Sequence, residues 1–478
     1  MPSKKLRDDV SVPLVVDVDG SLVNGDLLIE GTLRLLATTP FKLFSLPFWL
    51  AKGRAALKRR VARAVALPPE TLVLNPAVLE EIAAAKAAGR QIWLASAADE
   101  LVVAPLTERI GATGHLTSDG LTNLTGAAKA AMLVNRFGAG GFDYIGNEPR
   151  DLLVWKQARR AIGVNLSARL ARKVRILDTE ARFLPGPDRR PIDYIRALRP
   201  HQWSKNTLVF VPLVAAHEIQ ASLYLLAAGI FVALSVVASG TYLLNDLLDL
   251  PHDRRHERKR HRPLAAGTVP LLPMVGVGLA LATGGLVLAW SLSAWAGLYI
   301  LLYLLVTLAY SLSLKRKPFL DVITLALLFA IRVLAGAAVV HIALSPWFLA
   351  FFSFIFLSLA IVKRQSELRA LQESGGSTVS GRAYLTADLL AMTAFGAASS
   401  MAAVVVFALY IQTVEVGKSY GRPECLWLIC PLLIYWLGRM TLIANRGVMD
   451  EDPVTFALRD RTSWLAGVGV LAAFAVAL

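Results

Sequence analysis

The sequence has few cysteines and few charged residues. Two of its 478 residues are cysteine, Cys425 and Cys430, and both lie in one apolar stretch. This number excludes a disulfide scaffold and a zinc site built from cysteines. Charged residues make up 18% of the chain, and 35 acidic residues stand against 50 basic ones, which gives a net charge of +15.

Apolar residues are abundant instead. Hydrophobic residues make up 55% of the chain, and the mean hydropathy of +0.53 excludes a disordered chain and is too high for an ordinary soluble protein. Residues 1–200 carry 29 basic and 20 acidic residues, whereas 201–478 carry 21 and 15 between long apolar runs. We therefore expect a soluble front domain over residues 1–184, a linker over 185–193 and a membrane domain over 194–478.

Nine apolar segments follow one another in the back half. Most approach the roughly 20 residues that a helix needs to cross a bilayer. The first is short and contains Pro212. We expect an all-α domain of about nine transmembrane helices, at about 207–217, 221–245, 271–292, 295–314, 320–342, 346–362, 388–413, 425–444 and 463–478.

Basic residues gather in alternate loops of this domain. Four connections hold 17 of them, and the opposite loops hold Lys418 and Arg422. Because loops rich in Lys and Arg stay in the cytoplasm, we expect an inner (plasma) membrane protein whose front domain and active sites face the cytoplasm. The 17 residues are Arg254, Arg255, Arg258, Lys259, Arg260, Arg262, Lys315, Arg316, Lys317, Lys363, Arg364, Arg369, Arg382, Arg439, Arg446, Arg459 and Arg461.

Polar side chains follow apolar strands in the front domain. Residues 12–19 read Val-Pro-Leu-Val-Val-Asp-Val-Asp, so the first strand ends in Asp17 and Asp19. Further strands are expected at Gln91–Ala95 and Phe142–Ile145, separated by helical patterns such as Pro76–Ala88. This alternation predicts an α/β domain with a parallel sheet and a site at the carboxyl ends of its strands.

The order of the motifs resembles the haloacid dehalogenase phosphatase superfamily over about residues 10–165. The resemblance implies a Rossmann-like fold in which Asp17 attacks phosphorus and Asp19 protonates the leaving oxygen. It also implies that Ser96 and Lys129 hold the phosphate and that Mg²⁺ is bound by Asp17, Asp19 and Asp151. Asn147 stands where the family usually has Asp, so an inactive phosphatase-like domain is the alternative.

The insertion between Asp19 and Ser96 is long enough for a small helical cap. It contains an aromatic run, Pro40–Leu50, followed by a basic stretch. Aromatic and basic residues together favour the surface of a membrane, and a packed cap with a solvated basic face is the alternative.

Three aspartates mark the most informative stretch of the membrane domain, residues 245–267. Asp246, Asp249 and Asp253 are spaced by three and four, which on a helix end places them on one face. Clustered carboxylates repel one another, so a cation is expected between them, and oxygen ligands favour Mg²⁺ completed by substrate phosphates. Lys259, Arg260 and Arg262 follow and suit phosphate oxygens. The stretch predicts a diphosphate–Mg²⁺ site, with a solvated charged loop as the alternative.

Residues 245–254 resemble the signature Asn-Asp-x-x-Asp-x-x-x-Asp-Arg of the UbiA-type polyprenyltransferase superfamily. The likeness covers about residues 194–478 and implies nine helices and ionisation of a carbon–diphosphate bond. Most members alkylate an aromatic ring, and their second motif has two acidic residues four apart. Here that region has one, Asp321, and three bases, which counts against an aromatic acceptor. An aromatic prenyltransferase with a polyprenyl diphosphate donor remains the alternative.

Where the sequence differs from most members of the superfamily, it is similar to one branch, the decaprenyl-phosphate phosphoribosyltransferases. The similar segments are 199–206, 310–321, 363–368 and 450–461. That branch transfers 5-phosphoribose from phosphoribosyl diphosphate to a polyprenyl (decaprenyl) phosphate. Arg332 lies inside an apolar span, where a charged residue is a functional candidate. A structural ion pair is the alternative for Arg332. The expected substrate-binding residues of the membrane domain are Lys205, Asn245, Arg254, Lys259, Arg262, Tyr310, Lys315, Asp321, Arg332, Lys363 and Arg364.

Together these features predict a bifunctional enzyme. The front phosphatase would remove the 5-phosphate that the transferase leaves on the lipid product. The expected cofactor is Mg²⁺, and the expected partners are the two substrates and membrane lipid, with a homo-oligomer left open. The excess basic residues lie beside the membrane segments, and the sequence contains no nucleic-acid-binding motif. Both observations argue against a nucleic-acid partner. A transporter would place ionisable residues near the midplane, whereas these gather on one face.

Overall fold

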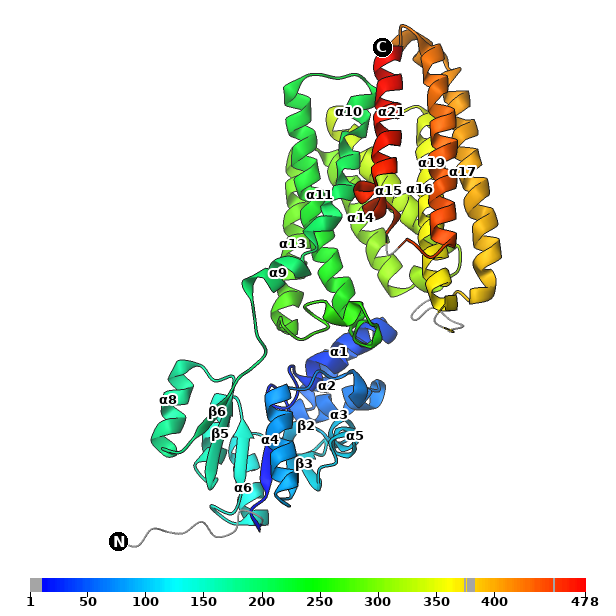
Figure 1. The fold of residues 1–478 in the computed structure, drawn as a ribbon. Helices are drawn as coiled ribbons and strands as arrows, with labels where there is room; N and C mark the ends of the chain where they lie inside the picture. The colour runs from blue at the N-terminus through cyan, green and yellow to red at the C-terminus, as the bar shows by residue number, and fades with distance from the viewer. Residues whose placement is uncertain (1–10, 374, 376–382, 450–451) are drawn as a thin grey trace. The chain divides into compact units, whose positions relative to one another are not determined.

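The computed structural model describes residues 11–373, 375, 383–449 and 452–478 (Figure 1). The chain forms two compact units. The first contains the residues up to Ala197 together with Asp246–Gly276, and the second contains Leu198–Asn245 and Val277–Leu478. The loop with the three aspartates therefore belongs to the first unit.

The described part of the first unit contains one six-stranded sheet. Its strands are paired in the order β3-β2-β1-β4-β5-β6, and every pair is parallel. The expected parallel sheet is confirmed. The strands are β1 (Leu14–Asp17), β2 (Ile92–Asp99), β3 (Gly114–Ser118), β4 (Asp143–Gly146), β5 (Arg160–Val164) and β6 (Arg182–Leu184).

Strand β1 lies in the middle of the sheet. Leu14, Val15 and Val16 are all buried, because helices cover both faces of a parallel sheet. The chain proceeds from β1 to β2 on one side and returns to β4 on the other. Ligands of open α/β sheets bind at the carboxyl ends of the strands where this order reverses. Asp17, the last residue of β1, occupies that position.

Two apolar layers enclose the sheet. One joins Leu14 and Val16 to Ile82 of α4 (Pro76–Ala87) and to Leu106 of α5 (Glu100–Ile110). The other joins Val15 to α6 (Gly126–Phe137), α7 (Leu152–Trp155) and α8 (Ala168–Leu177). The alternation of side chains along β1 thus feeds both layers.

A small helical cap is inserted between β1 and β2, as expected. It consists of α1 (Leu27–Thr38), the 3₁₀ turn η2 (Pro40–Ser45), α2 (Leu46–Ala51) and α3 (Arg54–Ala64). Its own small core contains Leu35, Val61 and Val65. The short helix α9 (Pro191–Ala197) follows the sheet.

The second unit is helical. Among the described residues, seven helical segments are long and apolar enough to cross a membrane. They are Ala221–Leu248 (α11), Leu271–Leu292 (α13), Ala294–Leu312 (α14), Leu320–Val340 (α15), Pro346–Glu373 (α16), Thr386–Ile411 (η8 and α17) and Pro423–Asn445 (η9 and α19). The remaining elements are η5 (Pro200–Phe210), α10 (Val211–Ala215), η7 (Leu314–Arg316), α18 (Val414–Ser419), α20 (Pro453–Arg459) and α21 (Arg461–Ala477).

The expected count of nine spans is not confirmed. The first expected segment, 207–217, is not one long helix, because it passes from η5 into the five-residue helix α10. Pro212 lies in the first turn of α10 and cannot continue the hydrogen-bond ladder of a longer helix. The last expected segment is the apolar helix α21, which has 17 residues.

We predict that Asn75→Ala loosens α4. The Asn75 side chain caps this helix by accepting the Ala77 N–H at 3.0 Å, and it donates to the Pro185 carbonyl at 3.2 Å. Loss of an N-cap costs about 1 kcal/mol, so amides of α4 should exchange about fivefold faster. Hydrogen–deuterium exchange of the full-length protein measures this. Glu80→Ala, an exposed change on the same helix, is the control, and equal exchange in both variants contradicts the prediction.

Candidate functional site

Asp17 is at the centre of a buried charged group in the first unit. Its carboxylate accepts hydrogen bonds from Lys129 Nζ at 2.6 Å and from the Ser21 hydroxyl at 3.2 Å. Burial raises the pKa of Asp17 to about 7, although Lys129 favours its charged form. Burial alone would lower the pKa of Lys129, but Asp17 and Asp151 outweigh it and raise that pKa.

Asp19 lies across the turn and contacts a different set of groups. Its carboxylate accepts the Leu27 N–H at 2.8 Å, at the start of α1, and the Ser96 hydroxyl at 3.3 Å. Burial raises the pKa of Asp19 to about 6. At neutral pH such a carboxyl can give or take a proton, as a general acid must.

Asp151 is used as a structural acceptor. One oxygen accepts the backbone N–H groups of Asn147 and Glu148, each at 2.9 Å, and the other accepts the Tyr144 hydroxyl at 2.9 Å. The Tyr144 oxygen in turn accepts from Lys129 at 3.1 Å. Asp151 therefore shapes the loop that carries Asn147, whose amide oxygen accepts from the Ser21 hydroxyl at 3.3 Å.

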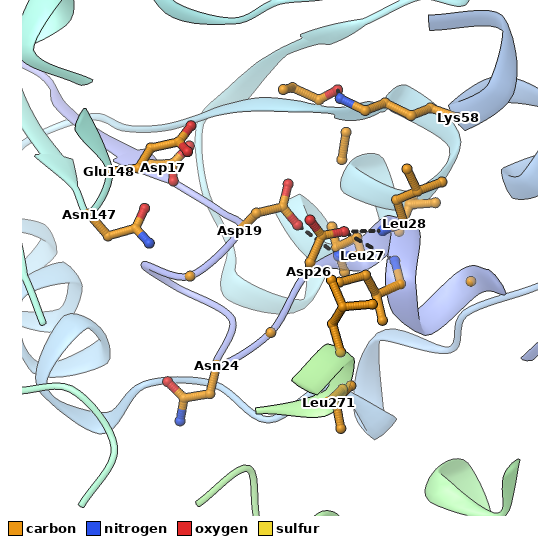
Figure 2. A pocket seen from close by; sticks show the side chains of 18 of the residues that line it. Asp17, Asp19, Asn24, Asp26, Leu27, Leu28, Lys58, Asn147, Glu148 and Leu271 are labelled. Carbon is orange, nitrogen blue, oxygen red and sulfur yellow. Dashed lines mark hydrogen bonds between the residues drawn. The ribbon is translucent and has the colours of Figure 1, made fainter. Parts of the chain in front are cut away.

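Of these side chains, Asp17, Asp19, Lys129 and Asn147 line a cleft of about 490 Å³ (Figure 2). Asp17, Asp19 and Asn147 supply oxygen atoms from the sheet side, and Lys58 reaches in from the cap helix α3. Lys58 donates to the Ala97 carbonyl at 2.7 Å and to the Asn123 side chain at 3.0 Å. Carboxylate and amide oxygens are donors that Mg²⁺ accepts, and lysines suit a phosphate.

The three aspartates of residues 246–253 do not share one helix. Helix α11 ends at Leu248, Asp249 lies at the break, and Asp253 belongs to the short helix α12 (Leu250–Arg255). The assumption that one helix end carries all three is wrong here. Pro251 explains the break, since proline and its preceding residue disfavour a continuous helix.

A guanidinium group lies between two of these aspartates. Arg262 donates to Asp253 at 2.6 Å and approaches Asp246 at 3.5 Å. Burial raises the pKa of Asp253, and Arg262 opposes that shift. No group of three or more His, Cys, Asp or Glu side chains in the described residues is arranged to hold a metal. Mg²⁺ nevertheless needs only one or two carboxylates when substrate phosphates complete its shell, and Asp246 and Asp253 could supply those carboxylates.

Arg254 is held within the first unit. Its guanidinium forms a forked pair with Glu30 of α1 at 2.8 and 3.0 Å, and it donates to the Thr71 carbonyl at 2.9 Å. Both side chains of the pair are buried. Such a two-pronged contact fixes orientation as well as charge. Arg254 thus fastens the aspartate loop to the cap and does not lie free for substrate.

In the second unit, Asp452 gathers two expected phosphate-binding lysines. Lys205 Nζ lies 2.6 Å and Lys363 Nζ 3.3 Å from the same Asp452 oxygen. Burial would raise the pKa of Asp452, but the two ammonium groups hold it well below its usual range. Two ammonium groups share one carboxylate, so this group of three side chains keeps a net positive charge. An anionic substrate could bind to it.

A second network surrounds Arg364, which is fully buried. Its guanidinium donates to Asp321 at 2.6 Å, to Glu367 and to the Tyr310 hydroxyl at 3.3 Å. Asp321 also accepts the Tyr384 hydroxyl at 2.6 Å. The structure therefore joins Tyr310, Asp321 and Arg364, three expected site residues, in one hydrogen-bonded group.

Arg332 is held by neutral partners. It donates to the Asn206 side chain at 2.9 Å and to the Tyr303 hydroxyl at 3.2 Å, and it lies over the rings of Tyr303 and Phe329. Among the described residues no carboxylate forms an ion pair with it, so the structural ion pair considered above is not found. Its positive charge remains uncompensated within this buried group.

The other expected residues are placed as follows. Lys315 is buried in η7, Asn245 is half-buried in the last turn of α11, and Lys259 is half-buried in the 3₁₀ turn η6 (Lys259–His261). Asp450 and Glu451 of the motif at 450–461, and Arg382 of the basic loops, lie outside the described residues.

Several residues at these sites were not among the expected ones. Lys58 lines the cleft of the first unit, and Tyr144 accepts a hydrogen bond from Lys129 there. Asp452 and Tyr384 belong to the networks of the second unit. Asp452 belongs to the segment 450–461 that was noted, so proximity to that motif is a usable signal. Lys58 belongs to a run of basic residues and Tyr144 to an apolar strand. The local sequence therefore does not mark either of them as a site residue.

A helical bundle with membrane-crossing helices, fused to an α/β unit with a carboxylate-lined cleft, defines an integral membrane protein with an α/β front unit. Residues 207–465 match the UbiA prenyltransferase family. The chain belongs to this family.

Two relatives indicate how the similarity is distributed. The chain is 34% identical to y4nM, an uncharacterized protein of Sinorhizobium fredii, over 98% of this chain and 92% of that protein, so that likeness extends over both units. It is 30% identical to the decaprenyl-phosphate phosphoribosyltransferase of Mycolicibacterium smegmatis, over 61% of this chain and 96% of that protein.

Solved structures are similar to the two parts separately. A UbiA homolog from Archaeoglobus fulgidus bound to GPP and Mg²⁺ is 18% identical, covers 59% of this chain and 99% of its own, and has a TM-score of 0.45. The apo form of a phosphoserine phosphatase is 17% identical, covers 36% of this chain and 93% of its own, and has a TM-score of 0.27.

We predict that the Arg364 network holds α15 and α16 together. Arg364→Lys removes the planar fork and should destabilise the protein by about 3 kcal/mol, since it disrupts a fully buried ion pair. Tyr384→Phe removes one hydrogen bond to Asp321 and should cost about 1 kcal/mol. The double variant should lose less than the sum, because both changes act on Asp321.

The measurement is the midpoint of thermal unfolding in detergent for the wild type, both single variants and the double variant. Arg369→Lys, which changes an exposed ion pair with Glu373, is the control and should have almost no effect. Strictly additive losses would show that the two residues act independently.

Proposed function

We propose that this protein transfers 5-phosphoribose from phosphoribosyl diphosphate to a polyprenyl phosphate and releases diphosphate. The observation that carries the proposal is the 30% identity to a decaprenyl-phosphate phosphoribosyltransferase over 96% of that protein. The anomeric carbon loses its bond to diphosphate and forms one to an oxygen of the acceptor phosphate. The acceptor is already an oxyanion, so the reaction needs no general base.

The charge distribution of the chain supports a donor with two separate phosphate groups. Asp246 and Asp253 are the carboxylates suited to Mg²⁺, and bound Mg²⁺ would neutralise the charge of the leaving diphosphate. Arg262 is close enough to both aspartates to bind the same diphosphate. In the second unit, Lys205 and Lys363 supply positive charge for a further phosphate, on the donor or on the lipid.

The absence of a second pair of acidic residues supports a phosphate acceptor over an aromatic one. In the region that usually has two, Asp321 is the one acidic residue, and it is already bound to Arg364 and Tyr384. A transferase of prenyl groups to aromatic rings would need this region for a second metal–diphosphate contact. Here its charge is taken up by buried partners.

We further propose that the front unit hydrolyses the 5-phosphate of the transferase product in the cytoplasm. Asp17 would attack phosphorus and form an aspartyl-phosphate, while Asp19 gives its proton to the leaving ribose oxygen. Lys129, 2.6 Å from Asp17, favours the charged nucleophile and can hold a phosphate oxygen. The pKa of Asp19, raised to about 6 by burial, suits a group that must carry a proton.

The transferase is tested with the purified full-length protein, Mg²⁺, ribose-labelled phosphoribosyl diphosphate and a polyprenyl phosphate. We expect a labelled lipid whose formation stops when Mg²⁺ is chelated. Asp246→Asn and Asp253→Asn should each lower the rate about a hundredfold, because each weakens the site for the metal–diphosphate. Glu257→Gln, an exposed change in the same loop, is the control. Transfer of a prenyl group to a phenolic acid, with no labelled lipid, would instead establish the aromatic prenyltransferase.

The phosphatase is tested by the mass of the same lipid product. We expect the wild type to yield lipid-linked ribose without its 5-phosphate, and Asp17→Asn to accumulate the phosphorylated lipid at an unchanged transfer rate. Glu108→Gln, an exposed change in the same unit, should behave as the wild type. If the wild type also retains the phosphate, the front unit is inactive on this ester, and Asn147 is then the first residue to restore to Asp.

A further inference from the structure

The cap carries a row of exposed aromatic rings. Phe41, Phe44 and Phe48 are 83%, 78% and 73% exposed, and Leu50 is 51% exposed. All four lie in the twelve residues of η2 and α2. Single exposed apolar residues are ordinary, but a contiguous exposed group marks an interaction surface.

These rings form one of two apolar faces of the segment η2–α2. Leu46 and Trp49, between and beside them in sequence, pack against the cap core of Leu35, Val61 and Val65. The phenylalanines recur at spacings of three and four, which keeps them on the side of the segment away from that core. The packing of the cap therefore does not use the face formed by Phe41, Phe44 and Phe48, which we call the aromatic face.

The charge around the aromatic face has one sign. Residues 31–69 contain no Asp or Glu and eight basic residues: Arg34, Lys42, Lys52, Arg54, Lys58, Arg59, Arg60 and Arg63. Lys42, Lys52 and Arg54 are exposed and lie next to the aromatic rings in sequence. Aromatic side chains combined with several Lys and Arg are what an anionic lipid surface attracts.

We propose that residues 40–54 form a membrane-docking element. The aromatic face enters the interfacial region of the bilayer, and Lys42, Lys52 and Arg54 contact anionic headgroups. Because the chain also contains membrane-crossing helices, the element is tethered to the bilayer that it binds, and its effective concentration at the surface is high.

A second copy of the chain is a poorer occupant. In a two-fold symmetric contact the same patch meets itself, which would bring two uncompensated basic stretches together. Like charges in contact oppose association, whereas an anionic bilayer relieves the same repulsion. Charge complementarity therefore favours lipid.

Docking has a consequence for the cleft of the front unit. Gly31, Lys58 and Val61, from the cap helices α1 and α3, line that cleft. Element η2–α2 connects these two helices in the chain. A cap bound to headgroups holds the cleft at the level where a lipid-linked phosphate ester presents its phosphate. This part of the inference rests on the proposed phosphatase function, whereas docking itself does not.

Docking is tested with an environment-sensitive fluorophore on the full-length protein. The background is Cys425→Ala with Cys430→Ala, and the label is placed by Phe44→Cys or, as the matched control, by Leu121→Cys, whose native side chain is 92% exposed in the same unit. Each protein is reconstituted in nanodiscs of phosphatidylcholine and phosphatidylglycerol. Quenching by nitroxide-labelled lipid is compared with quenching by aqueous iodide.

We expect the label at position 44 to be quenched by the lipid nitroxide and shielded from iodide, and the label at 121 to behave in the opposite way. Omitting phosphatidylglycerol should weaken the lipid quenching at 44. Access of iodide to position 44 would overturn the proposal. Shielding from both quenchers would also overturn it, because another part of the chain or a second copy then covers the aromatic face.

The link to catalysis is tested separately with Phe41→Ser, Phe44→Ser and Phe48→Ser combined. The matched control combines Leu101→Ser, Leu121→Ser and Ile176→Ser, three other exposed apolar residues of the unit. We expect kcat/KM for a lipid-linked ribose 5-phosphate to fall about tenfold in the first variant only, and hydrolysis of water-soluble ribose 5-phosphate to stay unchanged. Equal losses on both esters would contradict this link. Hydrolysis of neither ester by the wild type would reject the phosphatase and leave docking to the fluorescence result.

Discussion

A charged side chain removed from water must meet an opposite charge or a set of hydrogen bonds, and both units of this chain are organised by that requirement. In the first unit Lys129 lies between the carboxylate of Asp17 and the hydroxyl of Tyr144. In the second, Arg364 is fully buried and is held by Asp321, Glu367 and Tyr310. Breaking either group would leave a charge without a partner, so each fixes the positions of several elements at once.

The same requirement separates structural from chemical residues. Asp151 and Arg254 have their polar atoms taken up by backbone and side-chain partners, which suits a supporting role. Asp17 and Asp19 line a cleft, and burial keeps the pKa of both carboxyls near neutrality. Lys205 and Lys363 share one anion, and Arg332 has neutral partners. The second unit thus has positive charge that these partners do not neutralise and that could bind an anionic substrate.

Much of this arrangement could be predicted from the sequence. The parallel sheet and the membrane helices follow from local apolar patterns, and the cap follows from the length of the insertion between Asp19 and Ser96. Tyr310, Asp321 and Arg364 were expected as site residues because their motifs resemble those of one branch of the superfamily. The sequence did not predict the hydrogen bonds that join them. The break at Asp249 was missed because spacing alone cannot tell a continuous helix from two short ones, although Pro251 was a visible warning. Partners such as Lys58 and Tyr384 come from distant parts of the chain and carry no local signal.

The sequence by itself determined the kinds of structure: an α/β front part, an apolar helical back part, and carboxylates and bases at the ends of their elements. Periodicity and composition act over a few residues, so the sequence shows them directly. Only the tertiary structure decided which charges are paired and which remain available. The pairing of Arg254 with Glu30 depends on packing between segments far apart in the chain. The position of Arg262 between Asp246 and Asp253 and the exposure of the aromatic face depend on how neighbouring segments fold against one another, which periodicity does not show.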